Sequence, residues 1–199
     1  MVGGEREERV YNVTWHGRGG QGAVTAAMIF AEAVYLDGYK GVTVAPFFGV
    51  ERRGAPVTAS TRFSRHRIRT VSQVGGADVI LVLDERLLRT VDVLAGLSSG
   101  GLLIVNSRGI PESLCSRQDI VVAASDAAGI AKEIGLVVAG TIVINTPLLG
   151  ALARASGLVT MSSLEQAIRQ NFKEKAAELN IQGARLTFET TRTTGKWQA

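Results

Sequence analysis

A glycine-rich hexapeptide is the sequence feature best suited to hold a charged ligand. Gly17-Arg18-Gly19-Gly20-Gln21-Gly22 fits the pattern G-x-G-x-x-G and stands between an expected strand and an expected helix. Such a turn offers bare backbone N–H groups and the positive end of a helix dipole, and glycines let an anion approach closely. We therefore predict an anion-binding turn to which the Arg18 guanidinium adds a charged contact. The alternative is that the glycines only permit a tight turn and close packing of the helix.

The turn lacks the other marks of a dinucleotide or Walker site. A dinucleotide fold has an acidic residue about 20 positions further on, at the end of the second strand, to hold ribose hydroxyls. This sequence has Ala45-Pro46-Phe47 there, and Asp37 lies at the expected helix end. No Gly-Lys-Ser/Thr closes the turn. A simple dehydrogenase is disfavoured, while a stand-alone nucleotide- or phosphate-binding module stays open as an alternative.

A second loop combines adjacent charges with aromatic residues. Glu51, Arg52, Arg53 and Gly54 follow two phenylalanines near the carboxyl end of an expected strand, which is the usual binding edge of such sheets. We expect this loop to be a partner interface. The alternative is a surface loop in which Glu51 pairs with one of its arginine neighbours.

Other polar residues give weaker indications. Arg65, Arg67 and Arg69 alternate at strand spacing and would share one face of a hairpin, where they could receive phosphates or simply face solvent. His16 precedes the glycine turn and could titrate beside an anion or serve a structural role. No spacing indicates a nucleophile elbow or a catalytic triad, so no catalytic residue is assigned.

Composition limits the chemistry that the chain can perform by itself. The single cysteine, Cys115, cannot form an internal disulfide or hold a four-cysteine iron–sulfur cluster, and with two histidines it is a poor basis for a zinc site. A net charge of +4 does not demand nucleic acid and is compatible with small anionic ligands. The apolar stretches are far shorter than the roughly 20 residues of a membrane span. With a polar N-terminus that lacks a signal sequence, we expect a cytoplasmic protein without membrane or nucleic-acid partners.

Short apolar runs alternate with helical patterns along the chain. This order predicts one α/β domain with Rossmann-like α/β/α layers, a mostly parallel, mixed sheet, and flexible ends at 1–9 and 191–199. The antiparallel part is an expected hairpin of 57–63 with 67–71. The remaining strands are expected at 10–15, 42–47, 79–83, 102–105 and 120–123, and the helices at 21–36, 85–97, 125–134, 147–155, 162–171 and 172–190.

Four segments together resemble the gamma subunits, or the equivalent fused domain, of 2-oxoacid:ferredoxin oxidoreductases. The tryptophan–histidine opening and the Glu-Arg-Arg-Gly-Ala-Pro loop resemble the pyruvate and branched-chain enzymes more than the 2-oxoglutarate type. The segments are Trp15 to Ala23, Phe48 to Pro56, Ile68-Arg69 with Ser72-Gln73-Val74, and Asn145 to Gly150.

The resemblance implies a multi-subunit enzyme that decarboxylates a 2-oxoacid on thiamine diphosphate and passes electrons through iron–sulfur clusters to ferredoxin, making acyl-coenzyme A. Alpha, beta and delta subunits would hold the thiamine and the clusters, in agreement with the cysteine count. Gly17 to Gly22 would receive the coenzyme A phosphates, with Arg18 as the charged contact. Glu51 to Pro56 would contact another subunit. Pyruvate is the expected substrate, and 2-oxoisovalerate, indolepyruvate and 2-oxoglutarate are the alternatives.

Overall fold

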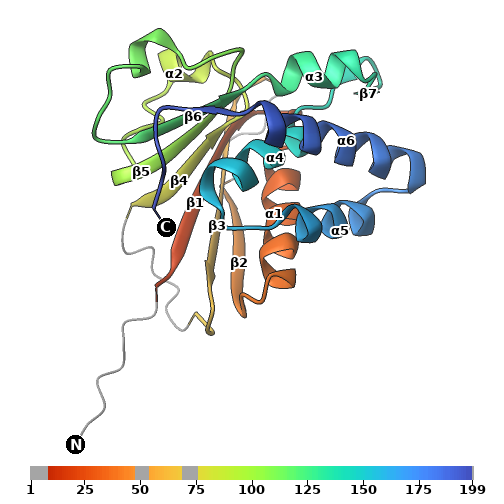
Figure 1. Cartoon of the computed structure of the whole chain (residues 1–199), viewed down its shortest axis with the longest axis horizontal. Coiled ribbons are helices and arrows are strands. Elements are labelled where there is room, and N and C mark those ends of the chain that lie inside the picture. Colours follow the sequence, from red (N-terminus) through yellow and green to blue (C-terminus); the bar gives the residue numbers. More distant parts are fainter. Residues whose placement is uncertain (1–8, 48–53, 69–75, 199) are drawn as a thin grey trace, which may run out of the picture.

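The computed structural model of the chain describes residues 9–47, 54–68 and 76–198. Within these residues the chain forms a seven-stranded sheet in the order β2-β3-β1-β4-β5-β6-β9 and a separate two-stranded hairpin (Figure 1). The strands are β1 (Tyr11–Arg18), β2 (Gly41–Phe47), β3 (Pro56–Ser64), β4 (Ala77–Val82), β5 (Leu97–Asn106), β6 (Val121–Ser125), β7 (Val137–Val138), β8 (Thr141–Ile142) and β9 (Arg192–Thr193). The helices are α1 (Ala23–Leu36), α2 (Leu87–Thr90), the 3-10 helix η1 (Glu112–Leu114), α3 (Ala127–Glu133), α4 (Asn145–Ser156), α5 (Met161–Asn171) and α6 (Glu174–Thr190).

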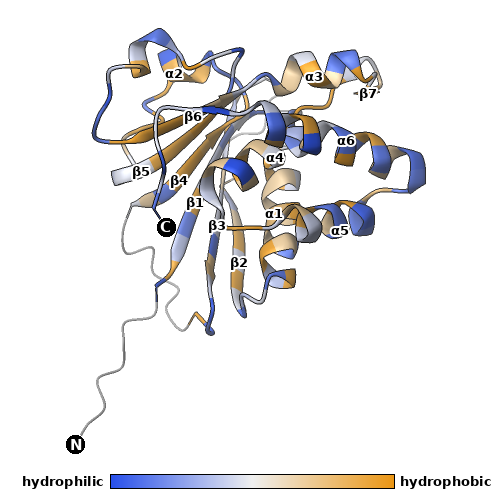
Figure 2. Cartoon of the chain, in the orientation of Figure 1, coloured by the Kyte–Doolittle hydropathy of each residue, from blue (hydrophilic) through white to orange (hydrophobic). Residues whose placement is uncertain are grey.

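The centre of the sheet is parallel, and both its faces are buried. β1, β4, β5 and β6 pair in parallel, whereas β3 runs antiparallel to its two neighbours and β9 runs antiparallel to β6. The run Leu102 to Val105 is fully buried, as its continuous apolar sequence requires. In Figure 2 the central strands are hydrophobic along much of their length. The expected α/β fold with a mostly parallel, mixed sheet is confirmed.

The antiparallel part of the sheet differs from the expected hairpin. β3 pairs with β1 on one side and β2 on the other, and residues 67–68 form no strand; residues 69–71 lie outside the described residues. β3 lies between β1 and β2 because one of its faces packs against α1. The Phe63 ring packs edge-on against Phe30 at 5.5 Å, and Thr61 accepts a hydrogen bond of 3.0 Å from the Trp15 indole. Alternation along 57–63 identified a strand but not its partners.

The helices cover the two faces of the sheet unequally. α1 and α4 lie on one face, and α5 and α6 pack outside them (Figure 1). The opposite face is covered over β4, β5 and β6 by α2, η1 and their loops. The expected helical crossover over 85–97 is reduced to the single turn α2, because Val91 adopts an extended conformation at its end. In the described part of the chain, no helix is long and apolar enough to cross a bilayer.

The segment from 137 to 144, whose apolar sequence Gly140 interrupts, contains the hairpin β7–β8. Its turn uses two residues with positive φ, Ala139 and Gly140, as tight hairpin turns require. α4 begins at Asn145, two residues before the expected start at Pro147. A proline is tolerated there because the first-turn N–H groups of a helix have no intrahelical partner.

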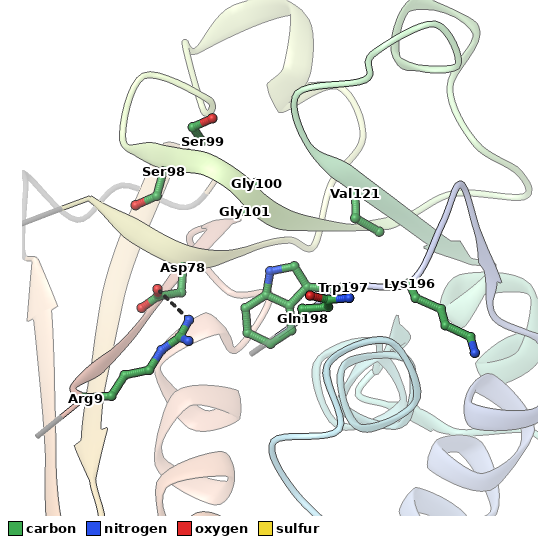
Figure 3. Close-up of a pocket in the computed structure, with 10 residues that line it drawn as sticks. All are labelled: Arg9, Asp78, Ser98, Ser99, Gly100, Gly101, Val121, Lys196, Trp197 and Gln198. Atoms are coloured by element: carbon green, nitrogen blue, oxygen red, sulfur yellow. Dashed lines mark ion pairs between the residues drawn. The ribbon is translucent and has the colours of Figure 1, made fainter.

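The C-terminal segment is attached to the sheet rather than frayed. β9 pairs with the outer edge of β6, and the Thr194 side chain accepts a hydrogen bond of 3.0 Å from the Val122 N–H. Trp197 is half-buried and lies beside Gly100 and Gly101 of β5 in a hollow of about 380 Å³ (Figure 3). An ion pair of 3.8 Å between Arg9 and Asp78 borders the same hollow. An aromatic anchor and ladder hydrogen bonds therefore hold the described part of this segment.

Replacing Trp197 with alanine should lower the free energy of unfolding by about 1–2 kcal/mol, because a half-buried aromatic side chain loses part of its apolar contact area. This corresponds to a decrease of roughly 2–8 °C in Tm for a chain of this size. Differential scanning calorimetry measures both values. Gln198→Ala, next to it and exposed, is the matched control and should leave Tm unchanged. Equal effects of the two substitutions would contradict the anchoring role.

Candidate functional site

The glycine turn lies at the topological switch point of the sheet, between β1 and β4. From β1 the chain passes through α1 to β2 on one side, and from β4 it passes through α2 to β5 on the other. Ligands of open α/β sheets bind in the crevice at such a point, outside the carboxyl ends of the strands. The N–H of Leu83 donates to the carbonyl of His16 at 2.8 Å, which closes the β1–β4 pair directly below the turn.

Two of the glycines are required by local packing. Gly22 has φ of 75°, and a Cβ there would lie 2.6 Å from the Asn145 side-chain nitrogen. A Cβ on Gly17 would lie 3.0 Å from the Leu83 side chain. Gly22 therefore serves the tight turn and the close approach of α1 and α4, and Gly17 serves the close packing against Leu83 after β4. Gly20 also has a positive φ of 91°, but open space surrounds it.

Part of the turn is braced by its own hydrogen bonds. The Arg18 N–H donates to the Gln21 side-chain oxygen at 2.8 Å, and the Gln21 N–H donates back to the Arg18 carbonyl at 2.9 Å. The Gly19 N–H donates to the carbonyl of Ala55 at 2.8 Å. These three N–H groups are not available to a ligand.

The remaining donors open onto a groove. In the described part of the chain, the N–H groups of Gly20, Gly22 and the first turn of α1 have no intramolecular acceptor. Gly20, Gly22 and Thr25 line a groove of about 340 Å³. α4 begins at the same place, where the Asn145 amide donates to the Gly22 carbonyl at 3.2 Å. Two helix N-termini therefore border one groove, and both favour an anion there.

The far wall of the groove is apolar. It is formed by the β7–β8 hairpin and Phe172. Val138 is 64% exposed and Ile142 is 37% exposed. The groove thus combines backbone donors at one end with an apolar surface along its length. A ligand with phosphates and a flexible, weakly polar arm matches both parts.

Arg18 is held by the protein itself. Its Nε donates to Asp84 at 2.8 Å, and its Nη1 donates to the carbonyl of Gly54 at 3.1 Å. The sequence analysis expected the Arg18 guanidinium to contact a ligand. Its positive charge is instead paired with the carboxylate of Asp84, just after β4.

Asp84 is the centre of this network. The residue is 7% exposed, and its carboxylate accepts hydrogen bonds from Arg18, from the Arg86 guanidinium at 2.8 and 2.9 Å, and from the Arg86 N–H at 3.0 Å. Gln21 also donates to it at 3.4 Å. The bonds from Arg86 and Arg18 outweigh the effect of burial and lower the pKa of Asp84 to about 2. The carboxylate is fully occupied and cannot serve as a base near neutral pH.

The loop from Glu51 to Pro56 contacts the glycine turn through Gly54. Gly54 donates its N–H to the Gly19 carbonyl at 3.2 Å, so the end of the Glu51-to-Pro56 loop lies against the glycine turn. Glu51, Arg52 and Arg53 themselves lie outside the described residues. The two motifs, which the sequence analysis treated separately, are thus neighbours.

The weaker candidates do not join the site as expected. Arg65 donates to the carbonyl of Asp37 at 2.7 Å and covers the Tyr39 ring at 4.1 Å, beyond the end of β3. It does not share a strand face with Arg67, and Arg69 lies outside the described residues. His16 lies below the turn, where burial lowers its pKa and favours the neutral imidazole.

The described residues form no cluster of metal ligands. Among the described residues, no group of three or more His, Cys, Asp or Glu side chains could hold a metal ion. Cys115 is exposed and is the only cysteine in the sequence. A four-cysteine iron–sulfur cluster therefore has no ligand set here.

Sequence reasoning missed the Asp84–Arg86 pair and the apolar hairpin. Asp84 directly follows the buried run 79–83, and a polar residue just after a central strand marks the binding edge of a parallel sheet. That signal was present in the sequence. The hairpin had only the weak signal of an Ala-Gly turn between short apolar pairs.

Comparison with known proteins gives consistent similarities. Residues 12–190 match the family described as pyruvate ferredoxin/flavodoxin oxidoreductase. The chain is 48% identical to the pyruvate/ketoisovalerate oxidoreductases common subunit gamma of Thermococcus litoralis, over 90% of this chain and 96% of that one. It is 44% identical to the pyruvate synthase subunit PorC of Methanothermobacter thermautotrophicus, over 89% and 93%. The crystal structure of pyruvate oxidoreductase subunit PORC from Thermotoga maritima superposes with a TM-score of 0.79 at 30% identity, over 94% of this chain and all of that one.

The low pKa of Asp84 predicts an acid-dependent loss of stability. Because its pKa is depressed from 3.8 to about 2 in the folded chain, the stabilisation is complete above pH 3.8 and is lost as pH falls towards 2, with a total of about 2 kcal/mol. Asp84→Asn should be less stable at neutral pH and should show a flatter stability profile between pH 4 and 2. Urea unfolding across this pH range measures the free energy of unfolding of both proteins. Parallel profiles for the two proteins would contradict the assignment.

Proposed function

Because the chain belongs to the pyruvate ferredoxin/flavodoxin oxidoreductase family, we propose that its glycine turn binds the phosphates of coenzyme A for the enzyme's acyl-transfer step. The observation that carries the proposal is the set of N–H donors of Gly20, Gly22 and the first turn of α1, which open together onto one groove. Phosphate groups are the ligands that such helix N-termini favour.

The shape and polarity of the groove support coenzyme A over a free inorganic anion. Coenzyme A joins a diphosphate to a long, weakly polar arm. The donors at one end suit the diphosphate, and the surface of Val138, Ile142 and Phe172 suits the arm. A simple phosphate would leave this apolar wall without a function.

The chain acts as the gamma subunit of a multi-subunit 2-oxoacid oxidoreductase. Alpha, beta and delta subunits would hold the thiamine diphosphate and the iron–sulfur clusters, and ferredoxin would accept the electrons. The single cysteine supports this division, because the clusters need thiolate ligands that this chain lacks. Glu51, Arg52, Arg53 and Gly54 would contact a partner subunit, and Gly54 brings the end of that loop next to the turn.

Pyruvate is the proposed substrate of the assembled enzyme. A second candidate is supported by the 48% identity to a subunit whose name assigns it to both pyruvate and ketoisovalerate oxidoreductases. In that case one gamma subunit would serve two enzymes. Purification of the native chain with its partner subunits, followed by assays with both oxoacids, would distinguish the two.

The isolated chain should show no oxidoreductase turnover and no iron. Reconstitution with the partner subunits should restore coenzyme A-dependent oxidation of pyruvate, measured by reduction of a viologen dye. Turnover or bound iron in the purified chain alone would contradict the assignment of the thiamine diphosphate and the clusters to partner subunits.

A negative charge at Thr25 should weaken coenzyme A binding selectively. Thr25 lies in the first turn of α1 and lines the groove, so Thr25→Glu would repel phosphates there. A carboxylate in the first turn favours the helix itself, so folding should be preserved. We expect the KM for coenzyme A in the assembled enzyme to rise about tenfold, equivalent to about 1.4 kcal/mol, with the KM for the oxoacid unchanged.

Met28→Glu provides the matched control. Met28 is 51% exposed one turn further along α1 and does not line the groove. It receives the same charge change and should leave both KM values unchanged. The assignment fails if Thr25→Glu assembles normally and binds coenzyme A as the unmodified enzyme does, by steady-state kinetics and calorimetry.

A further inference from the structure

Arg86 is an exposed side chain in a fixed position. Its side chain is 78% exposed, yet its Nε and Nη2 both donate to the buried Asp84 carboxylate, at 2.9 and 2.8 Å. An exposed arginine normally samples many rotamers, and this bidentate contact removes that freedom. The guanidinium is therefore held ready at the carboxyl edge of the sheet.

Most of the Arg86 hydrogen-bonding capacity remains available. A guanidinium has five N–H donors, of which two are used on Asp84. The other three have no acceptor among the residues that the structure describes. A side chain serving only as a brace for Asp84 would not need to present these donors to solvent.

Arg86 does not line the groove, but hydrogen bonds connect it to a residue that does. Gln21 lines the groove, and its Nε2 is 3.4 Å from Asp84 Oδ2. That oxygen is 2.8 Å from Arg86 Nη2. The guanidinium is thus two hydrogen-bond steps from a residue in the wall of the proposed phosphate site.

The local charge favours an anion. Arg18 and Arg86 share the single carboxylate of Asp84, so this cluster keeps one positive charge uncompensated. The Arg18 guanidinium is also bonded to the Gly54 carbonyl, and its side chain is only 24% exposed. Arg86 is therefore the cation of this cluster that a ligand can reach.

We propose that Arg86 binds the ribose 3′-phosphate of coenzyme A and thereby selects coenzyme A over cosubstrates that lack this group, with Asp84 as its positioning residue. This inference rests on the proposed function, in which the diphosphate occupies the N–H donors of Gly20, Gly22 and the first turn of α1. The 3′-phosphate is one ribose ring away from the diphosphate, and the arginine fork matches a phosphate group.

The experiment compares coenzyme A with 3′-dephospho-coenzyme A in the reconstituted enzyme. The unmodified enzyme should prefer coenzyme A at least about tenfold in kcat/KM, as expected for one bidentate charged contact. Arg86→Gln should bring the two cosubstrates to within about twofold of each other. It should do so by raising the KM for coenzyme A, with the KM for dephospho-coenzyme A and kcat unchanged.

The matched control is Arg89→Gln, which removes an exposed arginine from α2, the short helix that Arg86 precedes, and should keep the preference. Arg86→Lys, which keeps the charge but not the fork, should retain part of it and provides a second, conservative variant should Arg86→Gln fail to assemble. An equal rise in KM for both cosubstrates would overturn the proposal and assign Arg86 to bracing the turn. An unmodified enzyme without preference would also overturn it. The effect of Thr25→Glu decides independently whether the turn binds coenzyme A at all.

Discussion

One buried carboxylate connects the parts of the candidate site. Asp84 ends the central strand region and receives hydrogen bonds from Arg18 and Gln21 of the glycine turn and from Arg86 of its own segment. A buried charge is stable only when it is paired and hydrogen-bonded. The turn after β1 and the segment after β4 are therefore fixed relative to each other by a requirement of folding. A ligand that meets these segments meets a preorganised surface.

The N–H groups of the glycine turn fall into two sets. The N–H groups of Arg18, Gly19 and Gln21 are used internally and hold the turn in shape. Those of Gly20 and Gly22 have no acceptor in the described part of the chain. Packing constrains Gly17, whereas open space surrounds Gly20. Gly22 both lies against Asn145 in a left-handed conformation and lines the groove.

The sequence was sufficient where one residue pattern corresponds to one local structure. Continuous apolar runs located the central strands, and the helix expected over 125–134 corresponds to α3, where the Asp126 side chain accepts from the Gly129 N–H at 2.8 Å. It failed where the outcome depends on a distant partner. The alternation of 57–63 could not reveal that β3 lies between β1 and β2, and nothing near Trp197 indicated that β6 would accept a further strand.

Prediction of the candidate site also failed where contacts join residues distant in sequence. The local motif from Gly17 to Gly22 correctly located a turn between β1 and α1, but the ion pair of Arg18 depends on Asp84, a residue 66 positions away. No spacing rule links the two, because they meet only after β1 and β4 pair in the sheet. The burial that lowers the pKa of His16 is likewise a property of the assembled sheet and not of the histidine's neighbours in sequence.

Specificity must come from side chains, since the backbone donors of a helix N-terminus accept any phosphate. The groove wall of Val138, Ile142 and Phe172 favours a ligand with a weakly polar arm but makes no directional contact with it. The polar side chains at the turn are largely committed, because Gln21 and Arg18 bond to Asp84 and Asn145 bonds to Gly22. Within the ranges that the structure describes, the segment after β4 offers a second charged recognition point beside the turn. Among the residues bonded to Asp84, only Arg86 combines a fixed position with exposed donors, so discrimination between related anionic cosubstrates depends on the residue that the central carboxylate orients outward.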